Sequence, residues 1–207
     1  MSPRSYNLGK RKASTEGTRA RILEAARKLL ATETGPADLS MEAVARAADV
    51  SRLTIYYQFE SRRGLLEALY DYMADRGNMR QVAAIFQEPD PNKALEKMVK
   101  TFVEFWAFDP VVIRRVRGMA ALDAEIAAGM QARDSRRRRV AGEIIRRFHL
   151  HLHQLDPAKS EQQSVAADLL SMLTGFETYD ALAQAGHTDV AITEVVIRLS
   201  RAAIGSG

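Results

Sequence analysis

The chain has 207 residues, of which 46% are hydrophobic and 27% are charged, and it contains no cysteine. This balance is typical of a globular protein, and at about 150 residues per domain the length allows one large domain or two small ones. The lack of cysteine excludes disulfides, a thiolate nucleophile, Cys-ligated zinc and iron–sulfur clusters. Because no apolar run approaches the ~18 residues of a membrane span and no signal-peptide core is present, we expect a cytoplasmic protein that does not contact membranes.

The net charge of +4 lies entirely in the first third of the chain. Residues 1–70 hold 12 Lys/Arg and 8 Asp/Glu, whereas residues 71–207 hold 18 of each. This asymmetry has two interpretations: one end of the molecule binds a polyanion, or a basic tail keeps the protein in solution.

The first predicted helix follows a polar segment. Residues 1–17 have no apolar period and are predicted to form a disordered basic arm. A helix is then predicted from near Thr18 to Gly35, because apolar residues recur at helical spacing. That stripe consists of Ile22, Leu23, Ala26, Leu29 and Leu30.

Three further helices are predicted before residue 75. Ser40 is the expected N-cap of a short helix whose inward residues would be Met41, Val44, Ala45 and Ala48. After a tight turn, Ser51 is the expected N-cap of a third helix that reaches about Gln58. Glu60 or Ser61 is expected to cap a fourth, longer helix.

The remainder of the chain also has helical periodicity. A linker at 88–92 precedes a helix that ends at Asp109-Pro110. Further helices are predicted at about 110–121, 123–152, 161–184 and 189–204. Since no segment alternates and no hairpin signal occurs, the sequence predicts an all-α fold with roughly nine helices.

Residues 40–59 have the spacing of a helix-turn-helix, two short helices joined by a turn of about three residues. Such a motif places its second helix in the major groove of DNA. With Ile55 and Phe59 facing the core, the outward residues of that helix are Leu53, Thr54, Tyr56 and Tyr57. These side chains suit base edges, thymine methyls and phosphates. Arg52 opposes the helix dipole, which a contact with a phosphate or a guanine would explain.

Four stretches of this region resemble the N-terminal domain of the tetracycline-repressor (TetR) family over about residues 18–70. They are TRARILEAA from Thr18, LSMEAVARAADVS from Leu39, TIYYQF from Thr54 and SRRGLLEAL from Ser61. The resemblance implies an N-terminal helix-turn-helix DNA-binding domain (18–64) and a C-terminal helical effector-binding and dimerisation domain (65–207). It also implies a homodimer that binds a palindromic operator in double-stranded DNA, and a small-molecule effector that changes the spacing of its two DNA-reading helices.

The family's DNA contacts carry over by position. The resemblance implies DNA contacts from Thr54, Tyr56, Tyr57 and Gln58, and phosphate contacts from Thr18, Ser40 and Arg62. Leu53 departs from the family, which often has proline or a small residue there. We hypothesise that Leu53 reads a thymine methyl; the alternative is that it packs on Tyr57 and touches no base. Gly64 is a second departure, at a position where a better helix former is usual.

Aromatic and methionine side chains of the second domain have two interpretations. They suit the wall of an effector pocket, yet such stripes are also normal in a core. The candidates are Met98, Phe102, Trp106, Met119, Met172 and Phe176.

On the long helix, Arg133 and Arg137 fall in the apolar stripe, so each needs a partner. An anionic effector held by Arg137 is one possibility. The alternative is a structural ion pair with one of four carboxylates, Asp123, Asp168, Glu177 or Asp180.

The last two predicted helices carry more apolar surface than one face each requires. Their stripes are Leu169, Met172, Leu173 and Phe176, and Ile192, Val195, Val196, Leu199 and Ala203. We expect them to form a four-helix interface between two copies; the alternative is that they only cover the core. Gly175 is expected in mid-helix, where close approach of another helix would explain it.

No metal or cofactor is expected. His149, His151 and His153 are two residues apart, which splays their side chains on a helix. We therefore predict a ligand-responsive transcriptional repressor. Two alternatives remain: an architectural DNA binder indifferent to sequence, and an all-helical enzyme, which is disfavoured because no nucleophile motif, phosphate loop or metal set is present.

Overall fold

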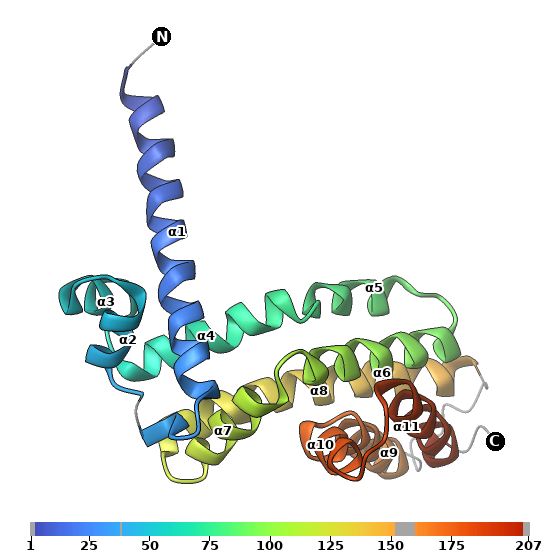
Figure 1. Ribbon diagram of the computed structural model, residues 1–207. Helices are drawn as coiled ribbons and strands as arrows, with labels where there is room; N and C mark the ends of the chain where they lie inside the picture. Colours follow the sequence, from blue (N-terminus) through green and yellow to red (C-terminus); the bar gives the residue numbers. More distant parts are fainter. Residues whose placement is uncertain (1–2, 38, 152–159, 205–207) are drawn as a thin grey trace. The chain divides into compact units, whose positions relative to one another are not determined.

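The computed structural model describes residues 3–37, 39–151 and 160–204, and these residues form helices and no strand. The helices of Figure 1 are α1 (Pro3–Ala31), η1 (Gly35–Ala37), α2 (Met41–Ala48), α3 (Arg52–Phe59), α4 (Arg62–Arg76), η2 (Met79–Gln81), α5 (Val82–Gln87), α6 (Pro91–Phe108), α7 (Pro110–Ala120), α8 (Ala124–His151), α9 (Ser160–Leu173), α10 (Phe176–Gln184) and α11 (Asp189–Ile204). The all-α prediction is confirmed. In the described part of the chain, none of the helices combines the length and apolar character needed to cross a bilayer.

Two of these eleven α-helices were not expected. The short helix α5 lies just before the predicted linker, where no helix had been assigned, and the helix predicted over 161–184 is broken into α9 and α10. Gly175 stands at this break as the N-cap of α10, with φ −76° and ψ 162°. The expectation that Gly175 lies in mid-helix is therefore wrong. A Cβ there would lie 3.0 Å from the carbonyl oxygen of Met172, so the close approach is to the preceding backbone.

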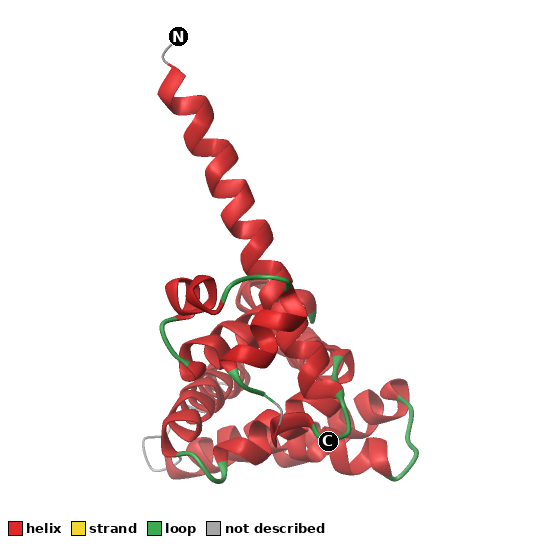
Figure 2. Ribbon diagram, turned by 60° about the vertical axis from the view of Figure 1, so that its left-hand side comes forward, coloured by secondary structure: helices red, strands yellow, loops and turns green. Residues whose placement is uncertain are grey.

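The N-terminal segment also differs from the prediction. We expected a disordered arm over 1–17, but α1 begins at Pro3, and its first half extends beyond α2 and α3 (Figures 1 and 2). Proline is tolerated in the first turn of a helix, and no other proline occurs before residue 36. Because extending an existing helix is much easier than starting one, the buried half of α1 provides the nucleus for the polar half.

The chain divides into two compact units whose boundaries are not those of the two predicted domains. The first unit contains the described residues of Met1–Met73 together with Val111–Ala127, and the second contains Ala74–Pro110 and the described residues of Ala128–Gly207. Helix α7 thus belongs largely to the unit of α1. Arg115 of α7 donates to the carbonyl oxygens of Leu30 and Thr32 at the end of α1. A division read along the sequence misses such a contact between segments about 80 residues apart.

The first unit buries most of the apolar stripes that were predicted for it, although Leu29 of α1 is only half-buried. Residues buried to 5% exposure or less include Ile22, Ala26, Leu30, Val44, Ile55, Phe59, Leu65 and Leu69. The expected inward residues of α2 are all buried. This shared core fixes α2 and α3 against α1.

The second unit has an aromatic core built on α6. The ring centroids of Trp106 and Phe105 lie 4.6 Å apart, and those of Trp106 and Phe176 lie 5.5 Å apart in an edge-on arrangement. The indole Nε1 of Trp106 donates to the carbonyl oxygen of Thr174 at 3.0 Å. Trp106 therefore joins α6 to the junction between α9 and α10.

Candidate nucleic-acid interface

The turn between α2 and α3 is fixed by local hydrogen bonds. Ser40 caps α2 by accepting from the backbone N–H of Ala43 at 3.1 Å, and Ser51 caps α3 by accepting from that of Thr54 at 3.0 Å. Between them Asp49 takes the left-handed conformation, with φ 52°, so the chain reverses in three residues. Both predicted N-caps and the predicted turn are confirmed.

Helix α3 has one buried face and one strongly exposed face. Ile55 and Phe59 are 0% and 4% exposed, whereas Leu53 and Tyr57 are 78% and 87% exposed. At 100° per residue, Leu53 and Tyr57 lie almost opposite Ile55, and Tyr56 lies to one side at 37% exposure. The outward face that the sequence predicted is present.

The flanks of α3 are used partly for its own support. Thr54 is half-buried, and its Oγ1 lies 2.8 Å from Ser51 Oγ. Gln58 is also half-buried, and its carbonyl oxygen accepts a hydrogen bond from Arg19 of α1 at 3.0 Å. The Arg19 guanidinium lies 4.4 Å from the centre of the Phe59 ring. The sequence analysis did not predict that Arg19 supports α3, because the sequence shows only a cation next to Thr18.

Arg52, the first residue of α3, takes part in an exposed polar cluster. Its Nη1 lies 2.6 Å from Oε1 of Glu42 in α2, and its Nη2 donates to the Tyr56 hydroxyl at 3.3 Å. The Tyr56 hydroxyl first, and then the Glu42 carboxylate, raise the pKa of Arg52 above its usual value. Glu42 was not among the predicted site residues. The only sequence signal for it was a carboxylate on α2, ten positions before the arginine that begins α3.

The three predicted phosphate contacts stand in different positions. Ser40 lies at the N-terminus of α2, as expected. Thr18 lies in the middle of α1, so the expectation that it marks a helix N-terminus is wrong, because α1 extends back to Pro3. Arg62, at the start of α4, is exposed and donates through Nε to the carbonyl oxygen of Leu39 at 3.2 Å.

Gly64, the second departure from the family pattern, has a steric explanation. A Cβ at this position would lie 2.1 Å from the carbonyl oxygen of Phe59, a distance that real Cβ atoms essentially never show. The close approach brings the first turn of α4 against the end of α3. Glycine is therefore required by this particular junction.

The residues predicted to bind an effector are only partly brought together. Met98, Phe102, Trp106 and Phe176 are buried in the second unit. Met119 belongs to the first unit, and Met172 is 59% exposed because it lies on the outer side of α9. Trp106 borders a small packing gap that has no room for a water molecule, and the other residues that line it include Val99, Val103, Leu173, Tyr179, Ile192 and Val196. Nothing in the sequence distinguished these aliphatic residues from ordinary core.

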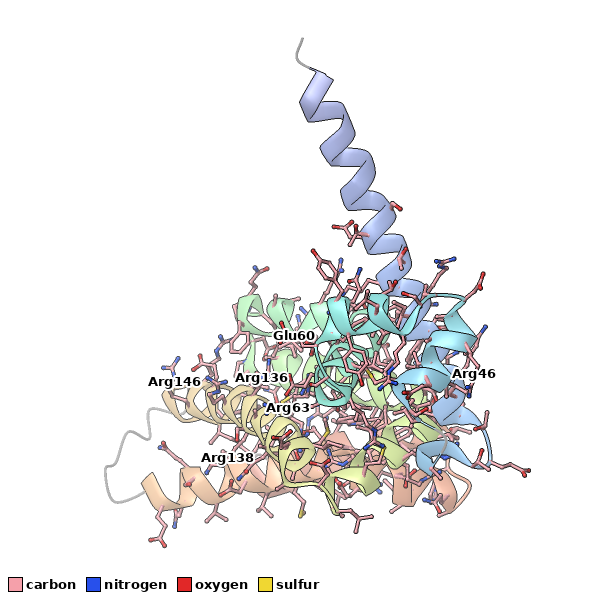
Figure 3. All side chains as sticks on the ribbon, turned by 90° about the vertical axis from the view of Figure 1, so that its left-hand side faces the viewer. Arg46, Glu60, Arg63, Arg136, Arg138 and Arg146 are labelled. Atoms are coloured by element: carbon pink, nitrogen blue, oxygen red, sulfur yellow. The ribbon has the colours of Figure 1, made fainter. Side chains whose placement is uncertain are left out.

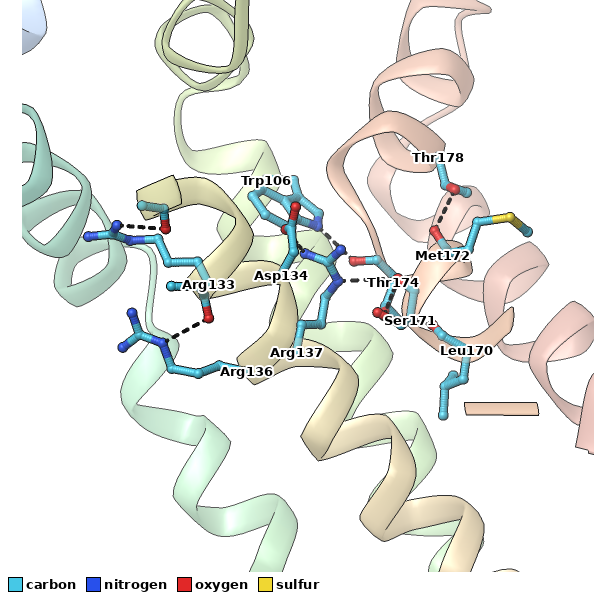
Figure 4. A network of polar contacts seen from close by, with 12 residues as sticks. Trp106, Arg133, Asp134, Arg136, Arg137, Leu170, Ser171, Met172, Thr174 and Thr178 are labelled. Atoms are coloured by element: carbon cyan, nitrogen blue, oxygen red, sulfur yellow. Dashed lines mark hydrogen bonds and ion pairs between the residues drawn. The ribbon is translucent and has the colours of Figure 1, made fainter. Parts of the chain in front are cut away.

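Arg137 is buried, as its position in the apolar stripe predicted, at 8% exposure. Its Nη1 lies 2.7 Å from Oδ1 of Asp134, one turn earlier on α8, and its Nε donates to the carbonyl oxygen of Ser171 at 3.2 Å (Figure 4). Arg133 is only half-buried and donates to the carbonyl oxygen of Gly129. Asp134 is not one of the four carboxylates that were expected to pair with Arg137.

Arg136, Arg138 and Arg146 of α8 are exposed (Figure 3). Arg138 pairs with Asp168, which had been a candidate partner of Arg137, and Arg146 pairs with Glu143 at 2.7 Å. The side chains of His149 and His151, and all of His153, lie outside the described residues. Within the described residues, no group of three or more His, Asp or Glu side chains is placed to hold a metal ion.

Together, the capped turn, the anchored face of α3 and its exposed opposite face define a helix-turn-helix of the DNA-binding type. Comparison with known proteins agrees. The family described as bacterial regulatory proteins, tetR family, matches residues 22–69, which span the last part of α1, all of α2 and α3, and the first half of α4. The chain is 36% identical over 116 residues to the HTH-type transcriptional regulator AlkX of Mycobacterium tuberculosis, and 30% identical over 109 residues to the HTH-type transcriptional regulator EthR of Mycolicibacterium smegmatis.

These alignments cover 54% and 51% of this chain, and the chain spans about half the length of both relatives, 53% and 50%. Two solved structures share the fold.

A TetR transcription regulator from Haloarcula marismortui superposes with a TM-score of 0.71 at 15% identity, and the superposition covers 92% of this chain and 98% of that protein's chain. A TetR-like transcriptional regulator from Rhodococcus sp. superposes with a TM-score of 0.67 at 17% identity, covering 92% and 97%. Residues 22–69 of the chain therefore match the N-terminal domain of the tetR family of bacterial regulatory proteins, and the fold of the described chain is that of TetR regulators.

Proposed function

We propose that the protein is a transcriptional repressor that binds a palindromic operator as a homodimer and is released by a small-molecule effector. The observation that carries this proposal is the exposure of Leu53 and Tyr57 on a helix whose other side is anchored by Ile55 and Phe59. Leu53 and Tyr57 are four residues apart on a helix and so are neighbours on one face, where they form an exposed apolar patch of the kind that marks an interaction site. The relatives named above are transcriptional regulators, which supports a regulator over an enzyme.

In this proposal α3 enters the major groove. The bases or the sugar–phosphate backbone are contacted by Arg52, Leu53, Tyr56 and Tyr57. The DNA is also contacted from the flanks of α3, by Thr54 and Gln58. Ser40 and Arg62 hold phosphates on either side, with Thr18 contributing from the middle of α1. Leu53 would read a thymine methyl. An equal loss of affinity for every sequence on Leu53→Ala would show that Leu53 reads no base.

The homodimer is proposed to form through the last helices. α9 and α11 pack against each other (Figure 1), and both keep large apolar side chains exposed. They include Val165 at 53%, Leu169 at 37% and Met172 at 59% on α9, and Val190 at 69% and Leu199 at 45% on α11. A four-helix interface with a second copy would bury them. Sedimentation at micromolar concentration tests this part, since a single 23 kDa species would rule out the dimer.

The effector is proposed to enter beside Trp106 and to be largely apolar. Most residues that line the gap there are aliphatic, and the gap has no room for a water molecule, whereas typical ligand pockets have about 300–1,000 Å³. Binding would therefore have to open the packing around α6, and the effector could act by favouring that opened state. Coupling of this kind is typically about 1–3 kcal/mol and is reciprocal, so DNA should weaken effector binding by the same factor.

Footprinting of the purified full-length protein on the DNA upstream of its own coding region tests the proposed function. We expect a protected palindrome and an affinity at least about 10³-fold above that for unrelated DNA at the same salt concentration. A ratio near one would instead favour the architectural, sequence-indifferent binder.

A further inference from the structure

The contact between Glu42 and Arg52 joins the two helices of the helix-turn-helix at its solvent-facing side. The side chains are 44% and 59% exposed, and their charged atoms lie 2.6 Å apart. On its other side, the Arg52 guanidinium donates to the Tyr56 hydroxyl and lies 5.3 Å from the centre of the Tyr56 ring. A long side chain that is usually mobile is thus held from two directions.

Stability does not account for this arrangement. Exposed ion pairs typically contribute about 0–1 kcal/mol, and a cation in the first turn of a helix is opposed by the helix dipole. The cluster instead fixes the direction of a guanidinium beside the exposed face formed by Leu53 and Tyr57. Fixing it before binding reduces the conformational entropy that binding would otherwise remove.

We propose that Glu42 is a specificity-determining residue, which commits Arg52 to the edge of a guanine and away from phosphate. The inference rests on the proposed function, binding of a DNA operator by α3. A phosphate that approaches Arg52 would meet the Glu42 carboxylate beside it, and two like charges at this distance repel each other. Guanine O6 and N7 are neutral acceptors, which Glu42 does not repel in this way.

The donor count of Arg52 is sufficient for this role. A guanidinium has five N–H groups, of which Glu42 and Tyr56 accept one each, so three remain for a base. Two parallel hydrogen bonds to O6 and N7 of guanine are the usual specific contact of arginine in the major groove. Lysine in this place keeps the charge but lacks the planar pair of donors.

Selection of binding sites from random-sequence duplex DNA, with full-length protein, tests the proposal. Wild type should enrich a palindrome with a guanine at one fixed position of each half-site. Arg52→Ala should lose that guanine and keep the other enriched positions, and Arg52→Lys should weaken the same preference. The loss expected for one bidentate contact is about 5- to 150-fold in discrimination between guanine and other bases at that position.

Glu42→Gln is the decisive variant. It should weaken the guanine preference at the Arg52 position and steepen the dependence of log Kd on log salt by about one, because Arg52 then contacts a phosphate. Glu67→Gln is the matched control, since Glu67 pairs with Arg63 on α4 at 2.9 Å and these side chains are 43% and 48% exposed. It removes the same charge from the same unit and should leave the guanine preference unchanged.

The outcomes separate this inference from the function on which it rests. If wild type enriches no sequence, sequence-specific operator binding fails and this inference fails with it. If wild type enriches a palindrome that Arg52→Ala retains at every position, Arg52 reads no base and only this inference is overturned. It is equally overturned if Glu42→Gln behaves like Glu67→Gln in both preference and salt dependence. Circular dichroism of each variant at the binding temperature establishes that α-helical content is retained.

Discussion

The exposed face of α3 and the side chains around Trp106 are both rich in aromatic and aliphatic residues, yet their environments are opposite. Leu53 and Tyr57 are 78% and 87% exposed, whereas Trp106 and Phe176 are 2% and 3% exposed. Two large apolar side chains that adjoin on one exposed helix face form a patch, and such patches mark interaction sites. Buried apolar side chains are the rule and are explained by packing alone. For this reason a role could be assigned to α3 residue by residue, while the effector site could be proposed only as a region.

The largest effect is expected from Trp106→Ala. Removing a buried indole with its hydrogen bond to Thr174 should lower the free energy of unfolding by about 3–5 kcal/mol. Urea unfolding followed by circular dichroism measures it, with Trp106→Phe as the milder variant. A loss below about 1 kcal/mol would contradict the contrast between a buried Trp106 and an exposed α3 face, because Trp106 would then border an open site.

A second test concerns the buried cation. Arg137→Met should destabilise the protein by about 1–3 kcal/mol, because Asp134 loses an ion pair and the Ser171 carbonyl oxygen loses one of its hydrogen bonds. Adding Asp134→Asn should recover part of that loss, and a double-mutant cycle gives the coupling. A coupling energy near zero would mean that Asp134 does not stabilise Arg137, and the anionic effector would become the better interpretation.

On α3 the expected effect is on binding alone. Tyr57→Ala should weaken operator binding by about 1–3 kcal/mol and leave the melting temperature unchanged, since the ring is 87% exposed. Leu122→Ala is a matched control, because Leu122 belongs to the same unit and is 92% exposed. A fall in melting temperature on Tyr57→Ala would show that the ring supports the fold.

The smallest expected effect depends on pH. Arg146, and then Arg147, lower the pKa of Glu143 from 4.5 to about 2, and Arg147 also donates to carbonyl oxygens at the end of α5. Because the pKa of Glu143 is lower in the folded state, the ionised carboxylate stabilises the folded protein above pH 4.5, and this contribution disappears as the pH falls toward 2. Glu143→Gln should therefore cost about 1 kcal/mol at pH 7, the value of a partly exposed pair. Urea titrations at several pH values check it, and a cost that does not shrink in acid would contradict it.

Local patterns predicted the DNA-binding part well, and contacts across the chain explain most of what they missed. Caps such as Ser40 and Ser51, and the anchoring of Ile55, depend on residues a few positions away, which a sequence displays directly. The pair between Glu42 and Arg52 spans the turn, so its geometry depends on how α2 and α3 pack. Gly64 is constrained by the carbonyl oxygen of Phe59, which no residue pattern reveals.

In the second unit, the sequence predicted burial better than it predicted partners and helix ends. The burial of Arg137 followed from periodicity, but that periodicity does not show which carboxylate its guanidinium reaches, and the partner is Asp134, three residues earlier on the same helix. The break at Gly175 was missed because apolar periodicity continues across it from Met172 to Phe176.

Photocrosslinking from position 57 tests the central claim most directly. The variant Tyr57→p-benzoylphenylalanine, bound to footprinted DNA and irradiated, should form a covalent adduct with bases of each half-site, and the same replacement at Leu122 should form none. Binding to DNA without an adduct from position 57 would mean that another surface of the protein contacts the duplex, which contradicts the account.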